Sequence, residues 1–116
     1  MESSKCKNLT ILKKSTPVYQ LTFKKDGVVT DITGWTIYMT VKKTIQLADS
    51  AAIINKKITD HSDATNGQTQ IELDTDDTDQ IGNYYYSIDW KDDDDNEGVV
   101  ISGRIQFADT VRDTKD

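Results

Sequence analysis

The sequence contains little cysteine, histidine or proline. Its 116 residues include one cysteine, one histidine and one proline. A single cysteine, Cys6, excludes an internal disulfide, and we expect it to be an incidental thiol. The single histidine, His61, lies in the polar segment HSDATNG, where we expect a solvated loop side chain rather than a catalytic base. Because no serine stands in a nucleophile-type turn, we predict that the protein is not an enzyme.

Long apolar runs are also missing. No stretch approaches the ~20 consecutive apolar residues of a membrane helix, and the N-terminus, MESSKCKNLTILKKS, is too polar for a secretion signal.

Basic residues are scarce in one half of the chain. Residues 1–58 contain ten lysines and four acids, whereas residues 59–116 contain four basic residues and sixteen acids. Since binding to a phosphate backbone needs clustered lysine and arginine, we expect neither a nucleic-acid nor a membrane partner.

What the sequence does contain is the alternation of apolar and polar residues that is typical of half-buried β-strands. Four long segments alternate in this way: 17–25, 35–43, 83–90 and 99–107. Three shorter candidates are 9–12, 53–58 and 68–73. In the last long segment Val99, Ile101, Ile105 and Phe107 are predicted to face inward, and Gly103 in that series suggests a bulge or a close backbone contact.

These patterns predict an all-β fold: an antiparallel, immunoglobulin-like β-sandwich of about seven strands, with at most one short helical turn, at 44–52. We expect a single sandwich domain over 9–108, between a flexible N-terminal segment (1–8) and a polar C-terminal tail (109–116). Gly82 and Tyr84 follow an acidic turn with the spacing of a tyrosine corner, in which the phenol bonds back to the preceding loop. Tyr84 as a plain core aromatic is the alternative interpretation.

Two sets of surface residues are candidates for binding. Tyr38 and Tyr85 fall in the outward register of their strands, and on neighbouring strands they would share one face, as suits a protein interface or sugar stacking. The acidic segment 92–97 offers oxygen ligands for calcium, although its spacing departs from an EF-hand loop. Its candidate ligands are Asp92, Asp94, Asn96 and Glu97. A solvated acidic tip is the alternative interpretation, and we expect no cofactor.

The charges predict how the loops are placed. In a sandwich of this kind we expect the acidic loops 74–79 and 92–97 at opposite ends. Lys13, Lys14, Lys42 and Lys43 are expected near the first loop, and Lys24, Lys25, Lys56 and Lys57 near the second. The hairpin at 91–98 would then be a negative tip that meets a basic partner or a cation.

The run FKKDGVVTDITGWTIYMTVKK resembles a pattern found in phage tail and baseplate proteins. In that pattern a strand leads through an Asp-Gly turn, here Asp26-Gly27, and an Asp-Ile-Thr-Gly segment, here 31–34, into a strand that ends in basic residues. The later run NGQTQIELDTDDTDQIGNYYYSIDW is similar to the second half of the pattern. Together the two runs resemble the N-terminal domain of phage baseplate upper proteins and related immunoglobulin-like tail and neck proteins.

This resemblance implies a virion structural or adaptor protein of the tail, baseplate, neck or capsid surface. It would be made in the bacterial host cytoplasm and would assemble with other virion proteins, as a homo-oligomer or ring. Within the 31–34 segment, Asp31 or Thr33 is expected to bond the local backbone and Gly34 to adopt an unusual dihedral. The alternative function is a carbohydrate- or host-surface-binding sandwich module, with or without calcium.

Overall fold

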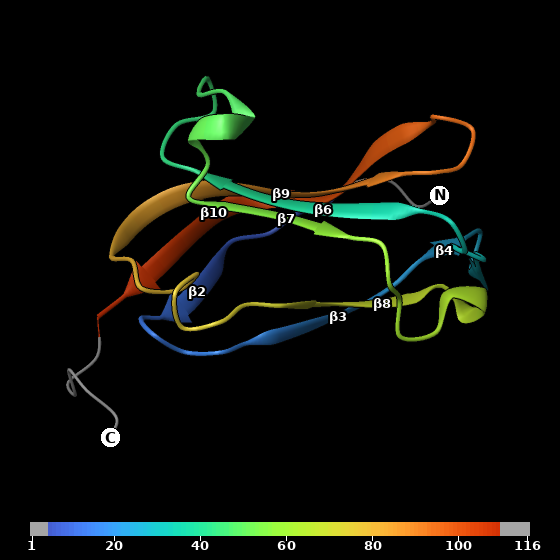
Figure 1. The fold of residues 1–116 in the computed structure, drawn as a ribbon, viewed down its shortest axis with the longest axis horizontal. Coiled ribbons are helices and arrows are strands. Elements are labelled where there is room, and N and C mark those ends of the chain that lie inside the picture. Colours follow the sequence, from blue (N-terminus) through green and yellow to red (C-terminus); the bar gives the residue numbers. More distant parts are fainter. Residues whose placement is uncertain (1–4, 110–116) are drawn as a thin grey trace.

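In the computed structural model, residues 5–109 are described and form two facing layers of β-strands (Figure 1). The larger layer is one sheet in the order β1-β10-β9-β6-β7, with β2 also paired to β10. Its strands are β1 (Lys5–Cys6), β2 (Leu9–Leu12), β6 (Thr36–Lys42), β7 (Ile54–Ile58), β9 (Gly82–Lys91) and β10 (Glu97–Ala108). The smaller layer pairs β3 (Val18–Thr22) with β8 (Gln68–Glu72), and a separate hairpin pairs β4 (Lys24–Lys25) with β5 (Val28–Val29).

The predicted all-β sandwich is confirmed, and each of the seven predicted segments contains a strand. The further strands β1, β4 and β5 have two residues each. Two pairings depart from the antiparallel expectation, because β1 and β2 both run parallel to β10. β1 also lies within segment 1–8, for which the sequence predicts no strand. The remaining parts of the predicted terminal segments, 1–4 and 110–116, lie outside the described residues.

Two short 3-10 turns replace the single helical turn that the sequence predicts. The first, η1 (Asp49–Ala51), lies in the expected segment 44–52, and the second, η2 (Ala64–Asn66), lies in the loop before β8. No α-helix occurs in residues 5–109. None of the helices in that part of the chain is long and apolar enough to cross a membrane.

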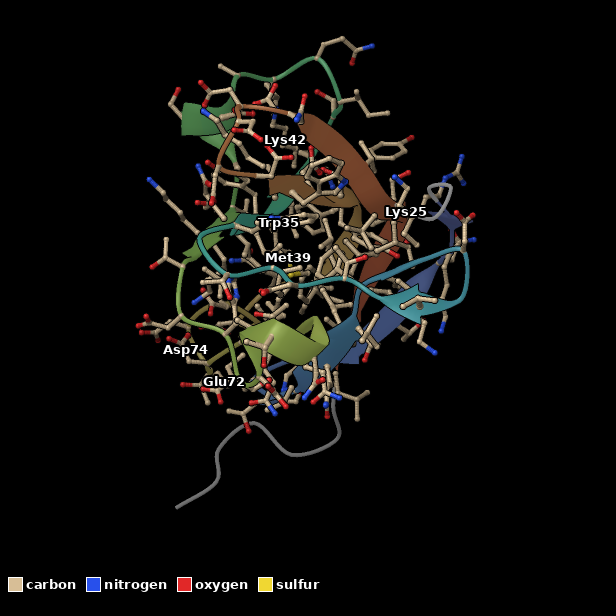
Figure 2. All side chains as sticks on the ribbon, turned by 90° about the vertical axis from the view of Figure 1, so that its right-hand side faces the viewer. Lys25, Trp35, Met39, Lys42, Glu72 and Asp74 are labelled. Atoms are coloured by element: carbon tan, nitrogen blue, oxygen red, sulfur yellow. The ribbon has the colours of Figure 1, made fainter. Side chains whose placement is uncertain are left out.

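The core lies between the two layers and is filled by the inward residues of each alternating strand. From the large sheet, Ile37, Met39 and Val41 of β6 are fully buried, and from the small sheet Ile71 is fully buried. Burying a side chain of this size stabilises the fold by about 1.5–3 kcal/mol relative to exposure. Figure 2 shows Met39 and Trp35 in the middle of the molecule, with Lys42 above them and Glu72 and Asp74 below.

A β-bulge in β10 changes which residues face outward. The pairing register with β9 shifts between Val99 and Ile101. Val99 therefore lies opposite Asp89 on the outer face and is 40% exposed, so the prediction that it faces inward is wrong. The close backbone contact predicted at Gly103 is present, because a Cβ at this position would collide with the carbonyl of Lys7.

The two acidic loops lie at opposite ends of β9 (Figure 1), as the charge pattern predicts. Lys13 is near the first loop, where its Nζ is 3.9 Å from Asp79 Oδ1. The placement predicted for Lys56 is wrong, because its Nζ is 2.7 Å from Asp77 Oδ2 in the first loop rather than near the second. Lys56 occupies the middle of β7, opposite Met39, and so its long side chain can cross to the other layer.

Candidate functional site

The outer face of the large sheet carries a groove of about 1110 Å³, which we call the outer groove. Its floor consists of outward side chains of β6, β9 and β10. Two segments project above this face in Figure 1, the loop between β6 and β7 that contains η1, and the β9–β10 hairpin. Ile45 of the loop and Val99 of β10 line the groove and are 67% and 40% exposed. The groove therefore combines a polar floor with apolar side chains whose exposure to water is unfavourable.

Strand pairing arranges the floor in three rows. One row places Tyr38 opposite Asp89, and Asp89 opposite Val99; a second contains Thr40, Ser87 and Ser102; a third contains Lys42, Tyr85 and Arg104. Tyr38 and Tyr85 thus share the outer face, on neighbouring strands. Tyr38 lies opposite Asp89, which is four residues, or roughly 14 Å, from Tyr85 along β9. The two tyrosines therefore occupy different ends of the groove and do not form one stacked pair.

At the Tyr85 end, the cations of the groove are already engaged. The Arg104 guanidinium lies over the Tyr85 ring, 5.9 Å from its centroid. Lys42 Nζ is 2.8 Å from Asp49 Oδ1 and donates a 2.8 Å hydrogen bond to the Leu47 carbonyl. These contacts anchor the loop between β6 and β7 to the sheet and hold Ile45 beside the floor.

Asp89 occupies the other end, between Tyr38 and Val99. Its Oδ1 is buried and has no hydrogen-bond partner among the described residues. Burial raises the pKa of the Asp89 carboxyl, a hydrogen bond from Ser87 opposes this, and the negative charges of Asp49 and Glu97 raise the pKa further. A carboxyl that is desolvated without a neighbouring cation is typical of binding sites.

Two of the candidate calcium ligands, Asp92 and Asn96, make side-chain contacts within the β9–β10 turn. Asp92 Oδ1 accepts hydrogen bonds from the N–H groups of Asp94 at 3.0 Å and Asn96 at 2.9 Å, and Asp92 Oδ2 accepts one from Asn96 Nδ2 at 3.1 Å. Desolvation opposes ionisation of Asp92, but these hydrogen bonds prevail and lower its pKa. Lys91 Nζ lies 3.4 Å from Asp95 Oδ1 across the same turn. The carboxylate oxygens of Asp92 therefore accept the hydrogen bonds of N–H groups within the turn.

Glu97, the fourth predicted ligand, lines the outer groove instead of joining the turn. Within the part of the chain that the structure describes, no group of three or more His, Cys, Asp or Glu side chains is arranged to hold a metal ion.

Asp31 and Gly34 have the local backbone roles that the sequence predicts for the 31–34 segment. Asp31 Oδ1 accepts hydrogen bonds from the Thr33 hydroxyl at 2.6 Å and the Thr33 N–H at 2.9 Å, and both lower the pKa of Asp31. Gly34 has φ 83° and packs against the Asp93 carboxylate, so a side chain at Gly34 would be strained and obstructed. This contact fixes the entry to β6 against the β9–β10 hairpin.

The tyrosines of β9 make two different backbone contacts. Tyr84 donates a 3.4 Å hydrogen bond to the Ile81 carbonyl, next to Gly82 with φ 119°, and its ring packs edge-on against Phe107. Tyr86, for which the sequence suggests no polar role, donates a 2.6 Å hydrogen bond to the Lys7 carbonyl and is 4% exposed. The buried phenol of Tyr86 therefore ties the N-terminal segment to β9.

His61 is not the solvated loop side chain that the sequence predicts. Its Nε2 is 2.8 Å from the Trp35 carbonyl oxygen, and its Nδ1 is 2.9 Å from the Thr69 hydroxyl. Because a carbonyl only accepts, Nε2 carries the proton, and in the neutral ring Nδ1 accepts from Thr69. Both ring nitrogens therefore join three segments of the chain.

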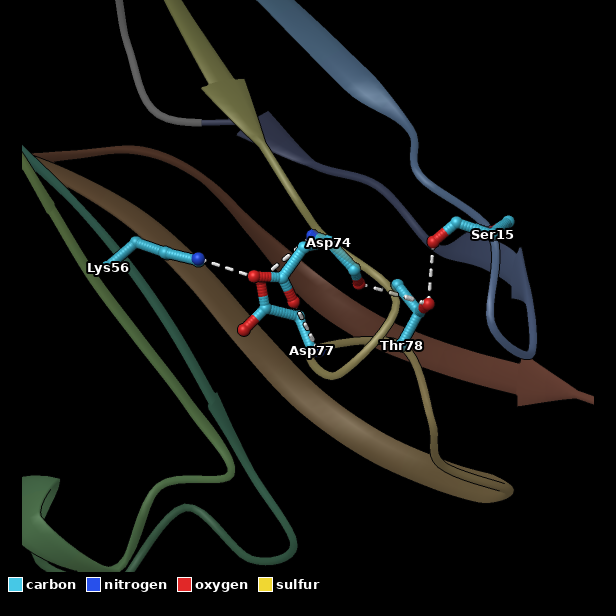
Figure 3. A network of polar contacts seen from close by, with 5 residues as sticks. All are labelled: Ser15, Lys56, Asp74, Asp77 and Thr78. Carbon is cyan, nitrogen blue, oxygen red and sulfur yellow. Dashed lines mark hydrogen bonds and ion pairs between the residues drawn. The ribbon is translucent and has the colours of Figure 1, made fainter.

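The loop between β8 and β9 holds a polar network that sequence reasoning missed (Figure 3). The N–H of Asp74 donates to Asp77 Oδ2 at 3.0 Å, and the N–H of Asp77 donates to Asp74 Oδ1 at 2.9 Å. Asp77 also binds Lys56, and the buried Thr78 hydroxyl donates to the Ser15 carbonyl at 2.6 Å. The D-x-x-D spacing signals such a reciprocal turn, whereas the partners Lys56 and Ser15 lie too far away in sequence to be found.

Comparison with known proteins finds a likeness in structure. No protein-family model matches the chain, and no curated protein matches it. Among solved structures, the chain is similar to the N-terminal domain of phage TP901-1 ORF48, at 8% sequence identity and a TM-score of 0.47. The likeness covers 93% of this chain and 98% of that chain.

Proposed function

We propose that this protein is a phage virion structural or adaptor protein that acts by binding other proteins and has no catalytic site. The observation that supports assembly is the outer groove, with exposed Ile45 and Val99 at its sides and Tyr38 and Tyr85 on its floor. Aromatic and aliphatic side chains around a few polar groups are what protein interfaces use. The phage part of the proposal is supported by the sequence pattern at 23–43.

The chemistry of the groove suits binding rather than turnover. Asp89 is its one carboxyl that is both desolvated and without an ion pair among the described residues, and no histidine, cysteine or lysine nucleophile lies opposite it in the sheet register. The protein would be made in the host cytoplasm, would join the particle through other virion proteins, and would act in several copies. Its place is the tail, baseplate, neck or capsid surface.

The test combines location with binding. Antibody against the chain should label purified virions in electron microscopy, and the pure chain should bind at least one other virion protein in surface plasmon resonance. We expect Ile45→Asp with Val99→Asp to weaken that binding at least tenfold. Val18→Asp is the matched control, because Val18 is 54% exposed on β3 in the other layer. Unlabelled virions together with no binding to any virion protein would overturn the proposal.

A second candidate, a carbohydrate- or host-surface-binding module, is favoured by one observation. The amides of Asn8 and Asn55 line the groove with Tyr38 and Tyr85, which are groups that hydrogen-bond and stack on sugars. A glycan array with and without a chelator tests it: retention that Tyr85→Ala removes supports this function, and a blank array removes it.

A further inference from the structure

We infer that the outer groove of one copy receives the β4–β5 hairpin of a second copy, so that copies join head to tail. This inference rests on the proposed function, because it names the two surfaces through which a self-assembling virion protein would contact itself. Both surfaces are present on every copy, and each has a feature that the fold of a single copy does not explain.

The hairpin is the first surface. Residues 24–29, KKDGVV, pair only with each other and belong to neither layer, and all six residues are exposed. Val28 is 66% exposed and Val29 is 44% exposed. A lone two-stranded hairpin is marginally stable in water, and exposed valines on such a projection gain from being covered. Figure 2 shows Lys25 at the right-hand side, away from Met39 in the core.

The hairpin presents the same chemistry on both of its faces. Lys24 pairs with Val29, and Lys25 pairs with Val28, so each face carries one lysine and one valine. The turn between them has positive φ at Asp26, 53°, and Gly27, 80°, the geometry of a tight two-residue hairpin turn. A short, well-formed basic and apolar projection results.

The groove has the complementary chemistry. Ile45 and Val99 offer apolar contact, and Asp89 and Glu97 offer negative charge. On the same face, Lys42 pairs with Asp49, and Lys91, which lies opposite Glu97 in the sheet register, pairs with Asp95. The exposed carboxylate of Glu97 can bind the ammonium group of an incoming lysine, and the neighbouring Asp89 carboxyl adds negative charge to this end of the groove.

The dimensions and positions also agree. The two strands of the hairpin are about 5 Å apart, and the three floor strands β6, β9 and β10 together span about 10 Å. The hairpin therefore fits along this floor. The groove is on the outer face of the large sheet, whereas β4 lies at one end of the molecule, below that face, in Figure 1. The contact is therefore heterologous: it joins two different surfaces, and repetition gives a ring or a filament.

Charge reversal tests the inference. We expect the wild-type chain to associate with rising concentration in sedimentation velocity experiments. Lys24→Glu with Lys25→Glu, or Asp89→Lys with Glu97→Lys, should each weaken association at least tenfold. An equimolar mixture of the two double variants should restore it. The intact basic hairpin of the groove variant then meets the intact acidic groove of the hairpin variant, and the acidic hairpin meets the basic groove. This rescue also shows that both variants are folded.

The control is Lys7→Glu with Lys57→Glu, which changes the net charge by the same amount as the hairpin variant but lies outside the hairpin and the groove lining. Loss of association in the control, or no rescue in the mixture, would overturn the inference. A wild-type chain that stays monomeric but still binds a virion protein through Ile45 and Val99 would overturn only the self-docking. A chain that self-associates in this way but is missing from virions would overturn only the proposed function.

Discussion

Asp89 is a residue whose ionised form is unfavourable in the folded state. Burial raises its pKa above the ordinary value of 3.8, so the folded state binds this proton more tightly than the unfolded chain does. The stability that it contributes is therefore complete at low pH and is lost as the pH rises through the raised pKa.

We therefore expect Asp89→Asn to increase the free energy of unfolding at pH 7, by roughly 0.5 kcal/mol because the side chain is only partly buried. Urea denaturation at pH 7 and pH 3 measures this, and the difference should vanish at pH 3, where both residues are neutral. The same variant should weaken self-association. A destabilised Asp89→Asn at pH 7 would show that the carboxylate is structural instead.

The pKa of Asp77 is shifted in the opposite direction to that of Asp89. Burial alone would raise its pKa, but the hydrogen bonds from Lys56 and from the Asp74 backbone, with the charge of Lys56, lower it. Its contribution to stability is then present above the unfolded pKa of 3.8 and lost as the pH falls through the lower folded value. A double-mutant cycle with Lys56→Met and Asp77→Asn should give a coupling of roughly 0.5–1 kcal/mol at pH 7. Equal coupling at pH 7 and pH 2 would contradict this.

The Thr78 hydroxyl is fully buried, and its loss would leave the Ser15 carbonyl without this partner. We expect Thr78→Val to lower the free energy of unfolding by about 1–3 kcal/mol. Thr75→Val, the same change at an exposed position of the same loop, should stay within about 0.5 kcal/mol. Chemical denaturation of the two variants measures the difference, and equal costs would mean that the bond to Ser15 contributes little.

At the scale of elements, β10 depends on a close approach that only glycine allows. A Cβ at Gly103 would meet the Lys7 carbonyl, whereas a Cβ at Gly27, which also has positive φ, would meet nothing. Gly103→Ala should therefore cost more than Gly27→Ala, by more than about 1 kcal/mol. Hydrogen exchange should show the loss concentrated in β1 and β2, and uniform loss of protection would contradict this mechanism.

The same elements show how much of the fold could be predicted from the sequence. Alternation is a local property, and so it found the seven longer strands, and local turn chemistry found the hydrogen bonds of Asp31 and the left-handed Gly34. The bulge near Val99 depends on how β10 pairs with β9, which no single segment reveals.

The candidate site was less accessible to sequence reasoning. Tyr38 and Tyr85 could be placed on one face, because register follows from alternation. Nothing in the sequence distinguishes Asp89 from the many other acids, because its desolvation depends on how the strands pack. His61 was assigned wrongly for the same reason: its partners, Trp35 and Thr69, are brought to it by the packing of the two layers.

At the scale of the whole molecule, β10 pairs with β9 on one side and with β1 and β2 on the other. We expect a chain that ends at residue 96 to lack the fold, since Ile105 and Phe107 fill the core and β2 has no other pairing partner in the described residues. Circular dichroism and limited proteolysis test this. A protease-resistant, strand-rich fragment 1–96 would show that β10 is dispensable.

The parallel pairing of β2 with β10 also has a consequence for synthesis. Leu9 to Leu12 leave the ribosome well before their partners, Ile105 to Ala108, are made. The sheet is thus completed only after β10 has left the ribosome, and its long-range pairings favour folding in milliseconds to seconds rather than microseconds. During that interval the apolar strands of the large sheet are uncovered, so the unfinished chain is exposed to aggregation until β10 pairs.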